Sequence, residues 1–350
     1  MTVRRIRMAK TNKKHTLRNV IIILLIAALL IGGGVTIFLK SRIMSNSEEE
    51  LEDAWDTPEY LKSKQLNVLV CGIDWDESRT NKLTDVILIC NIDLENGKVN
   101  MMQIPRDTYV GDIVYTGKIN ALYNWGIDDE DGNSTGVVGI KALASVIHEQ
   151  MQIPIDNYAM ITMEGFRTAV DTLGGVEVTI DEPIQFAEDN IMEPGTYVLD
   201  GVQADLFVRF RGYDDADVGR MSTQRRFLAG LMKKLQESSS IEIISLARNL
   251  YQYIETDFSV DEMISLANNV KGISTDKITM LRVPGEGVRG YGAMRLDVFS
   301  VHANELAELL NQYMRPYSDP IPVTELGLIE IQHTNEEWDD PDIETLGSYD

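Results

Sequence analysis

The sequence predicts an α/β fold, with a mixed central sheet flanked by helices, preceded by one N-terminal transmembrane helix. Two observations predict it. Short apolar runs rich in Val and Ile, typical of buried strands, alternate with segments of helical periodicity along most of the chain. Ahead of them, residues 20–39 form an uncharged apolar run, which is the length that a helix needs to cross the hydrocarbon core of a bilayer.

The N-terminal residues predict a membrane anchor and its orientation. Residues 1–19 carry seven Lys and Arg and no acid, and basic flanks stay on the cytoplasmic side. A cleaved signal peptide is the alternative, but its apolar region is shorter, about 7–15 residues, and ends in a small-x-small site. We therefore expect a cytoplasmic N-terminus, one span in the cell membrane, an extracellular stalk over residues 40–65 and an extracellular domain.

The folded domain is expected over residues 66–317. Short apolar runs rich in β-branched residues predict strands at 67–73, 85–92, 98–105, 157–161, 176–180 and 277–285. Apolar residues at helical spacing predict helices at 134–151, 163–173, 217–235, 241–254, 259–273 and 297–314. The remainder, residues 318–350, is rich in Pro, Glu and Asp and is predicted to be disordered.

The charge of the chain is strongly uneven. The net charge is −23, and after residue 19 only 25 of the 32 basic residues remain to face all 55 acidic ones. Such a domain is a poor nucleic-acid binder, because that affinity comes from neutralising phosphates. An anionic ligand would need a local basic pocket.

Cys71 and Cys90 are the only cysteines. Two interpretations stay open for them, a disulfide and two buried free thiols.

Two aspartates lie at the ends of predicted strands. Asp74 ends the first strand and Asp85 opens the second, so the two carboxylates meet if these strands are neighbours. Facing carboxylates repel unless they are protonated or bridged by a cation, and a hard ion such as Mg²⁺ suits their oxygens. The alternative interpretation is that each Asp is a turn or N-cap residue.

Arginines interrupt two further apolar patterns. Arg106 follows the strand that ends in QIP, and ligands of α/β sheets bind at strand ends; a surface ion pair with an acid such as Asp107 is the alternative. In FVRFRG, read as a strand, Arg209 and Arg211 share one face and are about 6.6 Å apart, which suits neighbouring phosphates. Two more polar candidates, Arg220 and Gln224, share a face of the next helix; a solvated strand and helix is the alternative.

These stretches resemble the LytR–CpsA–Psr family of cell-envelope glycopolymer transferases. The similarity runs from about residue 67 to residue 316. It rests on the order and spacing of NVLVCGID, LTDVILICNID, QIPRDTYV, KINALYNWG, VDTLGGVEV, FVRFRGYDDADVGRMSTQ, RVPGEG and LLNQYMRPY. The resemblance implies a membrane-anchored phosphotransferase. Such enzymes move a glycan, together with its linking phosphate, from a polyprenyl-pyrophosphate carrier to a hydroxyl of peptidoglycan.

The resemblance also implies roles for individual residues. Asp74 and Asp85 fall on the family's metal carboxylates, for Mg²⁺ or alternatively Mn²⁺, and together with Arg106 they are the catalytic candidates. The positions implied for the pyrophosphate pocket are Arg106, Arg209, Arg211, Arg220, Gln224 and, as a further basic candidate, Arg225. Leu83 and Thr223 stand where the family usually has arginine.

Two other functions stay open from the sequence. A pyrophosphatase would cleave the same lipid linkage with water as the acceptor. A non-catalytic envelope protein would bind the polyprenyl carrier without turnover, and Leu83 favours this alternative.

Overall fold

The structure is a computed structural model, and only part of the chain is described here. The described residues are 64–74, 82–129, 131–181, 183–187, 190–208, 210, 218–260, 262–264, 266, 272–291, 295–329, 331 and 343–345. The predicted cytoplasmic segment, the predicted span at residues 20–39 and nearly all of the predicted stalk lie outside them. None of the helices in the described part is long and apolar enough to cross a membrane.

A seven-stranded mixed sheet forms the centre of the domain, as the sequence predicted. Its strands are β1 (Gln65–Asp74), β2 (Leu83–Asp93), β3 (Lys98–Ile104), β4 (Asn157–Thr162), β9 (Ile254–Thr256), β10 (Ile278–Arg282) and β13 (Ile343–Thr345). Their order across the sheet is β13-β10-β3-β2-β1-β4-β9. The pairs β1–β4 and β3–β10 are parallel and the other neighbours are antiparallel.

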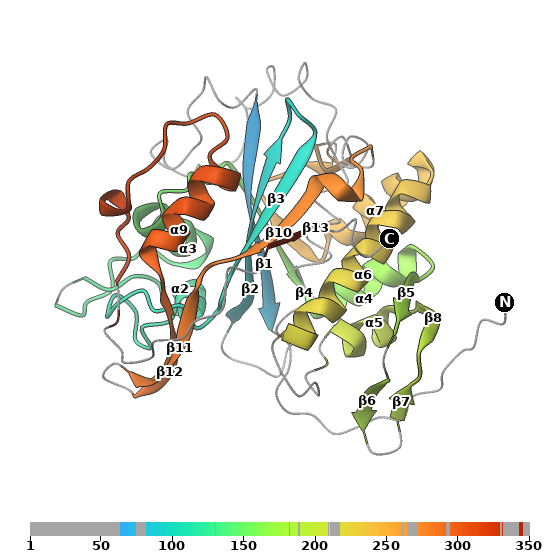
Figure 1. Ribbon diagram of the computed structural model, residues 1–350, viewed down its shortest axis with the longest axis horizontal. Coiled ribbons are helices and arrows are strands. Elements are labelled where there is room, and N and C mark those ends of the chain that lie inside the picture. Colours follow the sequence, from blue (N-terminus) through green and yellow to red (C-terminus); the bar gives the residue numbers. More distant parts are fainter. Residues whose placement is uncertain are drawn as a thin grey trace.

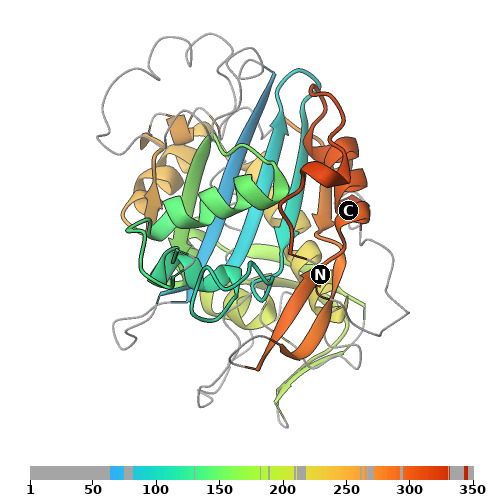
Figure 2. The same cartoon turned by 90° about the vertical axis from the view of Figure 1, so that its left-hand side faces the viewer.

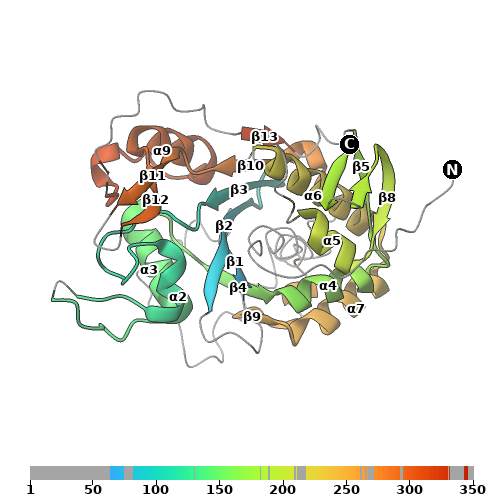
Figure 3. The same cartoon turned by 90° about the horizontal axis from the view of Figure 1, so that it is seen from below.

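Helices cover both faces of this sheet (Figure 1). One face carries α2 (Leu122–Trp125), α3 (Gly139–Met151) and α9 (Ala303–Leu309), and Figure 2 shows α3 and α9 lying on it. The other face carries α4 (Met163–Thr172), α5 (Gly201–Val208), α6 (Val218–Glu237) and α7 (Ser240–Tyr251), as the view in Figure 3 makes clear. The domain therefore has three layers, with the sheet in the middle.

The remaining elements are short. Two hairpins are β11 (Gly285–Tyr291) with β12 (Leu296–Val301) and β6 (Ile184–Ala187) with β7 (Asn190–Met192), and β5 (Val176–Ile180) pairs with β8 (Gly195–Leu199) in a further two-stranded sheet. Single turns of 3₁₀-helix lie at η2 (Ile119–Ala121), η3 (Thr275–Lys277) and η5 (Val323–Glu325), and a π-helical turn, η4 (Leu310–Met314), continues α9.

The continuous apolar runs of the central strands follow from burial on both faces. In β1, Val68 and Val70 pack into the core beneath α4 to α7, whereas Leu69 and Cys71 pack into the core beneath α3 and α9. Cys90 belongs to the first of these cores and Cys71 to the second. The two cysteines are buried free thiols on opposite faces of the sheet, and burial raises the pKa of both.

Three predicted segments differ from the structure. Residues 206–208, read as the start of a strand that includes Arg209 and Arg211, are the end of helix α5. Residues 297–301 belong to strand β12, so the helix predicted from residue 297 begins only at Ala303. The predicted disorder of residues 318–350 is wrong for the described part of that segment: Ile321 and Ile331 are buried, and β13 pairs with β10.

Candidate functional site

The ends of two paired strands bring the predicted aspartates to one edge of the sheet. Asp74, the last residue of β1, lies opposite Leu83, the first residue of β2. Gly72 pairs with Val86 and Ile73 with Thr84, so Asp85 is the extra residue of a β-bulge. Bulges often redirect a side chain next to a functional site. The two strands are thus neighbours, which is the condition for the two carboxylates to meet, whereas the side chain of Asp74 lies outside the described residues.

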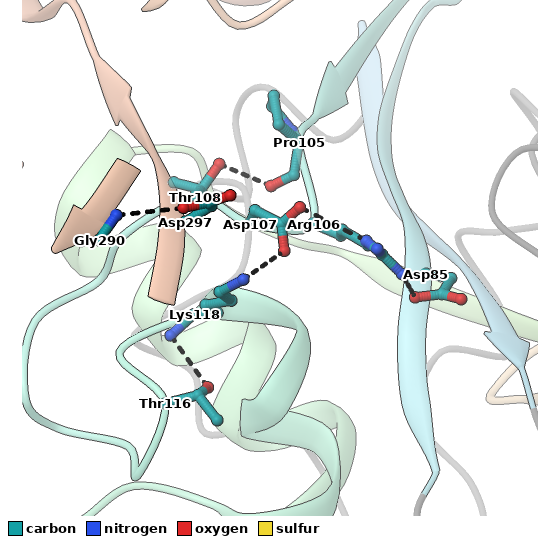
Figure 4. Close-up of polar contacts among 9 residues, drawn as sticks. All are labelled: Asp85, Pro105, Arg106, Asp107, Thr108, Thr116, Lys118, Gly290 and Asp297. Carbon is teal, nitrogen blue, oxygen red and sulfur yellow. Dashed lines mark hydrogen bonds and ion pairs between the residues drawn. The ribbon is translucent and has the colours of Figure 1, made fainter. Parts of the chain in front are cut away.

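Arg106 reaches Asp85 from the neighbouring strand. β3 pairs with β2 up to Ile104, which faces Ile87, so the chain beyond Pro105 continues toward the bulge. The Nη1 atom of Arg106 donates to Oδ1 of Asp85 at 2.8 Å (Figure 4). The Asp85 side chain is only 6% exposed and that of Arg106 is 30% exposed. This ion pair is therefore largely buried, and removing Arg106 would leave a buried carboxylate without its cation.

Asp107 links Arg106 to a second cation, Lys118. One carboxylate oxygen of Asp107 lies 3.5 Å from Nε of Arg106, and the other accepts from Nζ of Lys118 at 3.0 Å (Figure 4). Burial works to lower the pKa of Arg106, but the charges and hydrogen bonds of Asp85 and Asp107 outweigh it and raise this pKa. The result is a row of alternating charges, Asp85, Arg106, Asp107 and Lys118, at one edge of the sheet.

The backbone around Arg106 is held by several turn contacts. The amide and the hydroxyl of Thr108 both donate to the carbonyl of Pro105, at 3.0 and 2.6 Å. The amide of Asn120 donates to the carbonyl of Arg106, and the carbonyl of Asn120 accepts from the hydroxyl of Thr84 beside the bulge. Pro105 cannot extend the ladder, because it has no N–H to donate. The strand therefore ends where Arg106 and Asp107 turn toward Asp85 and Lys118.

Lys118 is the site residue that sequence reasoning missed. It lies in the stretch KINALYNWG, ahead of the turn η2 and helix α2. Tyr109 and Lys118 form an isolated antiparallel bridge, which places Lys118 beside Asp107. The only local signal was a single cation before a buried run, Ile119 to Leu122, and that signal does not say which carboxylate it meets.

The rest of the predicted pocket lies at the limit of the described residues. Arg209 and Arg211 are outside them. Arg220, Gln224 and Arg225 lie on α6, but their side chains are also outside. Thr223 is buried on the same helix, so the position where the family usually has arginine faces the interior in this chain. The structure therefore brings together Asp85 and Arg106 and leaves the contribution of the other arginines as a prediction.

The residues at this edge fit a divalent cation shared with a phosphate ligand. In the described residues there is no group of three or more His, Cys, Asp or Glu that could hold a metal alone. Mg²⁺, however, usually takes one or two carboxylates and fills its other positions with water and phosphate oxygens. The two carboxylates and the two cations of this row neutralise one another. A bound phosphate ligand would add negative charge that this row alone does not balance, and a divalent cation beside Asp85 would supply the missing positive charge.

Comparison with known proteins places these features in a family. The model of the LytR_cpsA_psr family matches residues 36–315 of this chain. The polyisoprenyl-teichoic acid–peptidoglycan teichoic acid transferase TagU of Oceanobacillus iheyensis is 31% identical over 235 residues, which are 65% of this chain and 69% of that protein. The corresponding transferase TagV of Bacillus subtilis is 27% identical over 282 residues, 76% of this chain and 68% of that protein.

The fold has the same relatives. The crystal structure of TagV from Bacillus subtilis superposes with a TM-score of 0.58 at 26% sequence identity, over 74% of this chain and 99% of that one. A Listeria innocua protein, Lin1025, superposes with a TM-score of 0.57 at 27% identity, over 73% of this chain and the whole of that one. The mixed sheet with helices on both faces is thus an arrangement already known from crystal structures.

Proposed function

Because the chain belongs to the LytR_cpsA_psr family, we propose that it transfers a glycopolymer with its linking phosphate from a polyprenyl-pyrophosphate carrier to peptidoglycan. The observation that carries this proposal is the half-buried pair of Arg106 and Asp85 at the ends of two paired strands. The names of the relatives, which are teichoic acid transferases acting on peptidoglycan, support the nature of both substrates. A teichoic acid is accordingly the glycopolymer that we favour.

The reaction replaces the phosphoanhydride bond of the carrier by a phosphodiester bond to the acceptor. A hydroxyl of the acceptor attacks the phosphorus that carries the glycan and loses its proton, while the bond to the bridging oxygen of the pyrophosphate breaks. Polyprenyl phosphate leaves with that oxygen. Phosphoryl transfer of this kind needs positioning and neutralisation of charge more than covalent help from the protein.

The described residues can supply both. Arg106 exchanges Asp85 for a phosphate oxygen, and its planar guanidinium can hold two oxygens at once. Lys118 likewise exchanges Asp107 for a phosphate oxygen and adds a second positive charge next to the first. Mg²⁺ held by Asp74 and Asp85 would supply the remaining neutralisation of the pyrophosphate. We further propose that Arg209, Arg211, Arg220, Gln224 and Arg225 complete the pocket.

The experiment measures donor binding and transfer in the same variants of the full chain, purified in detergent. Arg106→Lys and Arg106→Ala are both expected to weaken binding of a short-chain prenyl pyrophosphate, and transfer from it, by about 10- to 150-fold, the worth of a charge-assisted contact. Lysine should rescue little, because it keeps the charge but loses the planar fork. Arg315→Lys is the matched control, since Arg315 is a half-buried arginine that donates to the backbone carbonyl of Gln152.

The same assay separates the other candidate functions. Hydrolysis of the donor without peptidoglycan, as fast as wild-type transfer in its presence, would identify a pyrophosphatase that uses water as the acceptor. Tight prenyl-pyrophosphate binding with neither transfer nor hydrolysis would identify a carrier-binding protein. Wild-type donor affinity in both Arg106 variants would remove the basis of the proposed pocket. Chelation of divalent metal by EDTA is expected to abolish transfer if Asp74 and Asp85 hold Mg²⁺.

The substrates also imply a place in the cell. We propose that the apolar run at residues 20–39 anchors the chain in the cell membrane, with the N-terminus in the cytoplasm and the domain outside. Protease added to intact protoplasts should then digest the domain and spare an N-terminal tag. Full protection of the domain would reject this orientation.

A further inference from the structure

A small sheet beside Arg106 carries two tyrosines that the proposed phosphate chemistry does not use. Residues 107–109 pair on one side with β12, through the bridge between Thr108 and Phe299, and on the other side with Lys118. Hairpin β11–β12 thus continues the edge that begins at Arg106, and Figure 4 shows the hairpin beside Asp107 with the Arg106–Asp85 pair on the far side. Asp107 and Tyr109 alternate with the buried Thr108, so both lie on the face of this sheet that Lys118 shares.

Tyr109 and Tyr291 meet on this face. Their ring centroids are 5.1 Å apart and the ring planes are 84° to each other, an edge-to-face contact. Tyr109 comes from the stretch QIPRDTYV and Tyr291 from the end of β11. Both side chains are half-buried, so neither belongs to a core and neither is loose on the surface. Two rings at a right angle form a corner with an apolar wall and polar hydroxyls.

The orientation of Tyr109 is fixed by its neighbours. Its hydroxyl donates to the exposed carboxylate of Asp112 at 3.1 Å. Its ring lies so close to Gly117 that a Cβ atom there would meet Cε2 of Tyr109 at 2.6 Å, and Gly117 also has a positive φ of 67°. Burial, followed by the hydrogen bond and the charge of Asp112, raises the pKa of Tyr109 to about 12, so the ring is neutral at physiological pH. The hydroxyl oxygen keeps acceptor capacity for a ligand.

From this arrangement we propose that Tyr109 and Tyr291 form a saccharide-binding subsite, and that its occupant is the glycan strand of the acceptor. Aromatic faces next to hydroxyl and carboxylate groups bind sugars, whose C–H faces stack on the ring and whose hydroxyls bond the polar rim. Tyr109 is three residues from Arg106, at most about 10 Å along the backbone. A sugar stacked there places a hydroxyl of the same strand within reach of a phosphate held by Arg106.

The polar groups around the two tyrosines suit the hydroxyls of a sugar strand. Asp112 and Asp297 are both exposed at this face and hairpin, and Asp297 accepts from the amide of Gly290 at the turn of the hairpin. Carboxylates accept hydrogen bonds from sugar hydroxyls, and the ammonium group of Lys118 on the same face donates to sugar oxygens. The assignment of the strand as the acceptor rests on the proposed function, whereas the saccharide subsite itself does not.

The test uses the full chain in detergent and a defined probe, the β-1,4-linked tetramer of N-acetylglucosamine. Tyr291→Ala is the main variant, because Tyr291 is half-buried at the end of β11, a strand that has no buried residue; Tyr109→Ala and the Tyr→Phe changes at both positions accompany it. Each alanine variant is expected to lower the affinity for the tetramer, measured by NMR titration, about tenfold, as truncation of an aromatic anchor does. Phenylalanine should retain most of it. Tyr251→Ala, an exposed tyrosine of α7 on the other face of the sheet, is the control.

The companion measurement is the affinity of the same variants for a prenyl pyrophosphate. Unchanged donor affinity together with a raised KM for the acceptor supports the assignment to the acceptor. Wild-type affinity for the tetramer in Tyr291→Ala and Tyr109→Ala would overturn the subsite, and so would an equal loss in Tyr251→Ala. Equal loss of donor affinity would assign the tyrosines to the donor instead. If wild type binds the tetramer but no prenyl pyrophosphate, the proposed function fails and the saccharide subsite stands.

Discussion

Strand β2 carries a charged contact at each end, and the two contacts have different tasks. At its start, Asp85 is paired with Arg106. In the proposed function, Arg106 leaves Asp85 and binds a phosphate oxygen when the donor binds. At its end, Asp93 accepts from the hydroxyl of Tyr317 at 2.5 Å and from the backbone and side chain of Asn96, both at 2.9 Å. These partners lie at the end of β2 that is away from the candidate site, and we interpret the contact as stabilising the fold. Burial works to raise the pKa of Asp93, but the hydrogen bonds from Tyr317, Asn96 and Glu95 outweigh it and lower this pKa.

The lowered pKa of Asp93 predicts a pH-dependent effect of Tyr317→Phe. A carboxyl whose pKa is lower in the folded than in the unfolded chain stabilises the fold above its unfolded pKa, and this contribution is lost as the pH falls through the folded value. At pH 7, Tyr317→Phe should reduce the free energy of unfolding by about 1.5–3 kcal/mol, the worth of a hydrogen bond to a charged group. Below about pH 4 the difference from wild type should narrow.

Urea denaturation of both proteins at pH 7 and at pH 3 measures this. Tyr115→Phe is the control, since the Tyr115 side chain is 68% exposed and should change stability at neither pH. A difference between Tyr317→Phe and wild type that is the same at both pH values would contradict the role of the Asp93 charge.

At the scale of the elements, most patterned helices and the runs rich in β-branched residues were predictable, whereas one short apolar run, ADLFV, was not. Helices α3, α4, α6 and α7 lie within a few residues of the periodic segments that predicted them. Apolar residues that recur every three or four positions over about three turns fall on one face only if the segment is an α-helix. The run ADLFV, in contrast, is compatible with a strand or with a buried helix, and periodicity alone does not distinguish them.

Local capping would have distinguished them. Asp200 and Gln203 form a reciprocal pair at the start of α5. The carboxylate of Asp200 accepts from the amide of Gln203 at 2.8 Å, and the side chain of Gln203 accepts from the amide of Asp200 at 3.1 Å. A cap residue followed three positions later by Glu or Gln is a helix start, and DGVQ has this pattern. The strand read over FVRFRG therefore does not begin at residue 207, because residues 207 and 208 end α5, whereas Arg209 and Arg211 lie outside the described residues.

The candidate site shows the same limit. Arg106 and Asp85 were predictable as candidates, since each is a charged residue next to an apolar run, Arg106 after the end of one strand and Asp85 near the start of another. Lys118 was not, because its partner Asp107 is 11 residues away and only the bridge between Tyr109 and Lys118 brings them together. The Tyr109–Tyr291 contact is more distant still and depends on the placement of hairpin β11–β12. Sequence patterns thus locate charges at element ends, whereas partners between elements follow from the fold.

For the whole molecule, the described C-terminal residues belong to the domain and do not form a loose tail. Leu326 and Leu328 pack against the core beneath α3. The amide of Gly327 donates to the carbonyl of Gln150 at 3.1 Å, and a Cβ atom at Gly327 would lie 2.7 Å from the carbonyl oxygen of Glu149. This close approach needs glycine. Composition predicted disorder because Pro, Glu and Asp outnumber the apolar residues of this segment. Composition does not show which apolar residues are buried, and in the structure Ile321 and Ile331 are.

Truncation of the chain after residue 317 is therefore expected to destabilise the domain. Full burial of an isoleucine side chain contributes roughly 1.5–3 kcal/mol, so the loss of Ile321 and Ile331 alone should cost about 3–6 kcal/mol as an upper estimate. That is a large share of the 5–15 kcal/mol typical of a domain.

A chain ending at residue 331 keeps both isoleucines and loses β13, which leaves the edge of β10 unpaired. Its stability should lie between those of the shorter truncation and the full chain. Deletion of residues 346–350, which removes no described residue, is the control. Equal urea midpoints for the chain ending at residue 317 and the full chain would mean that this segment does not stabilise the fold.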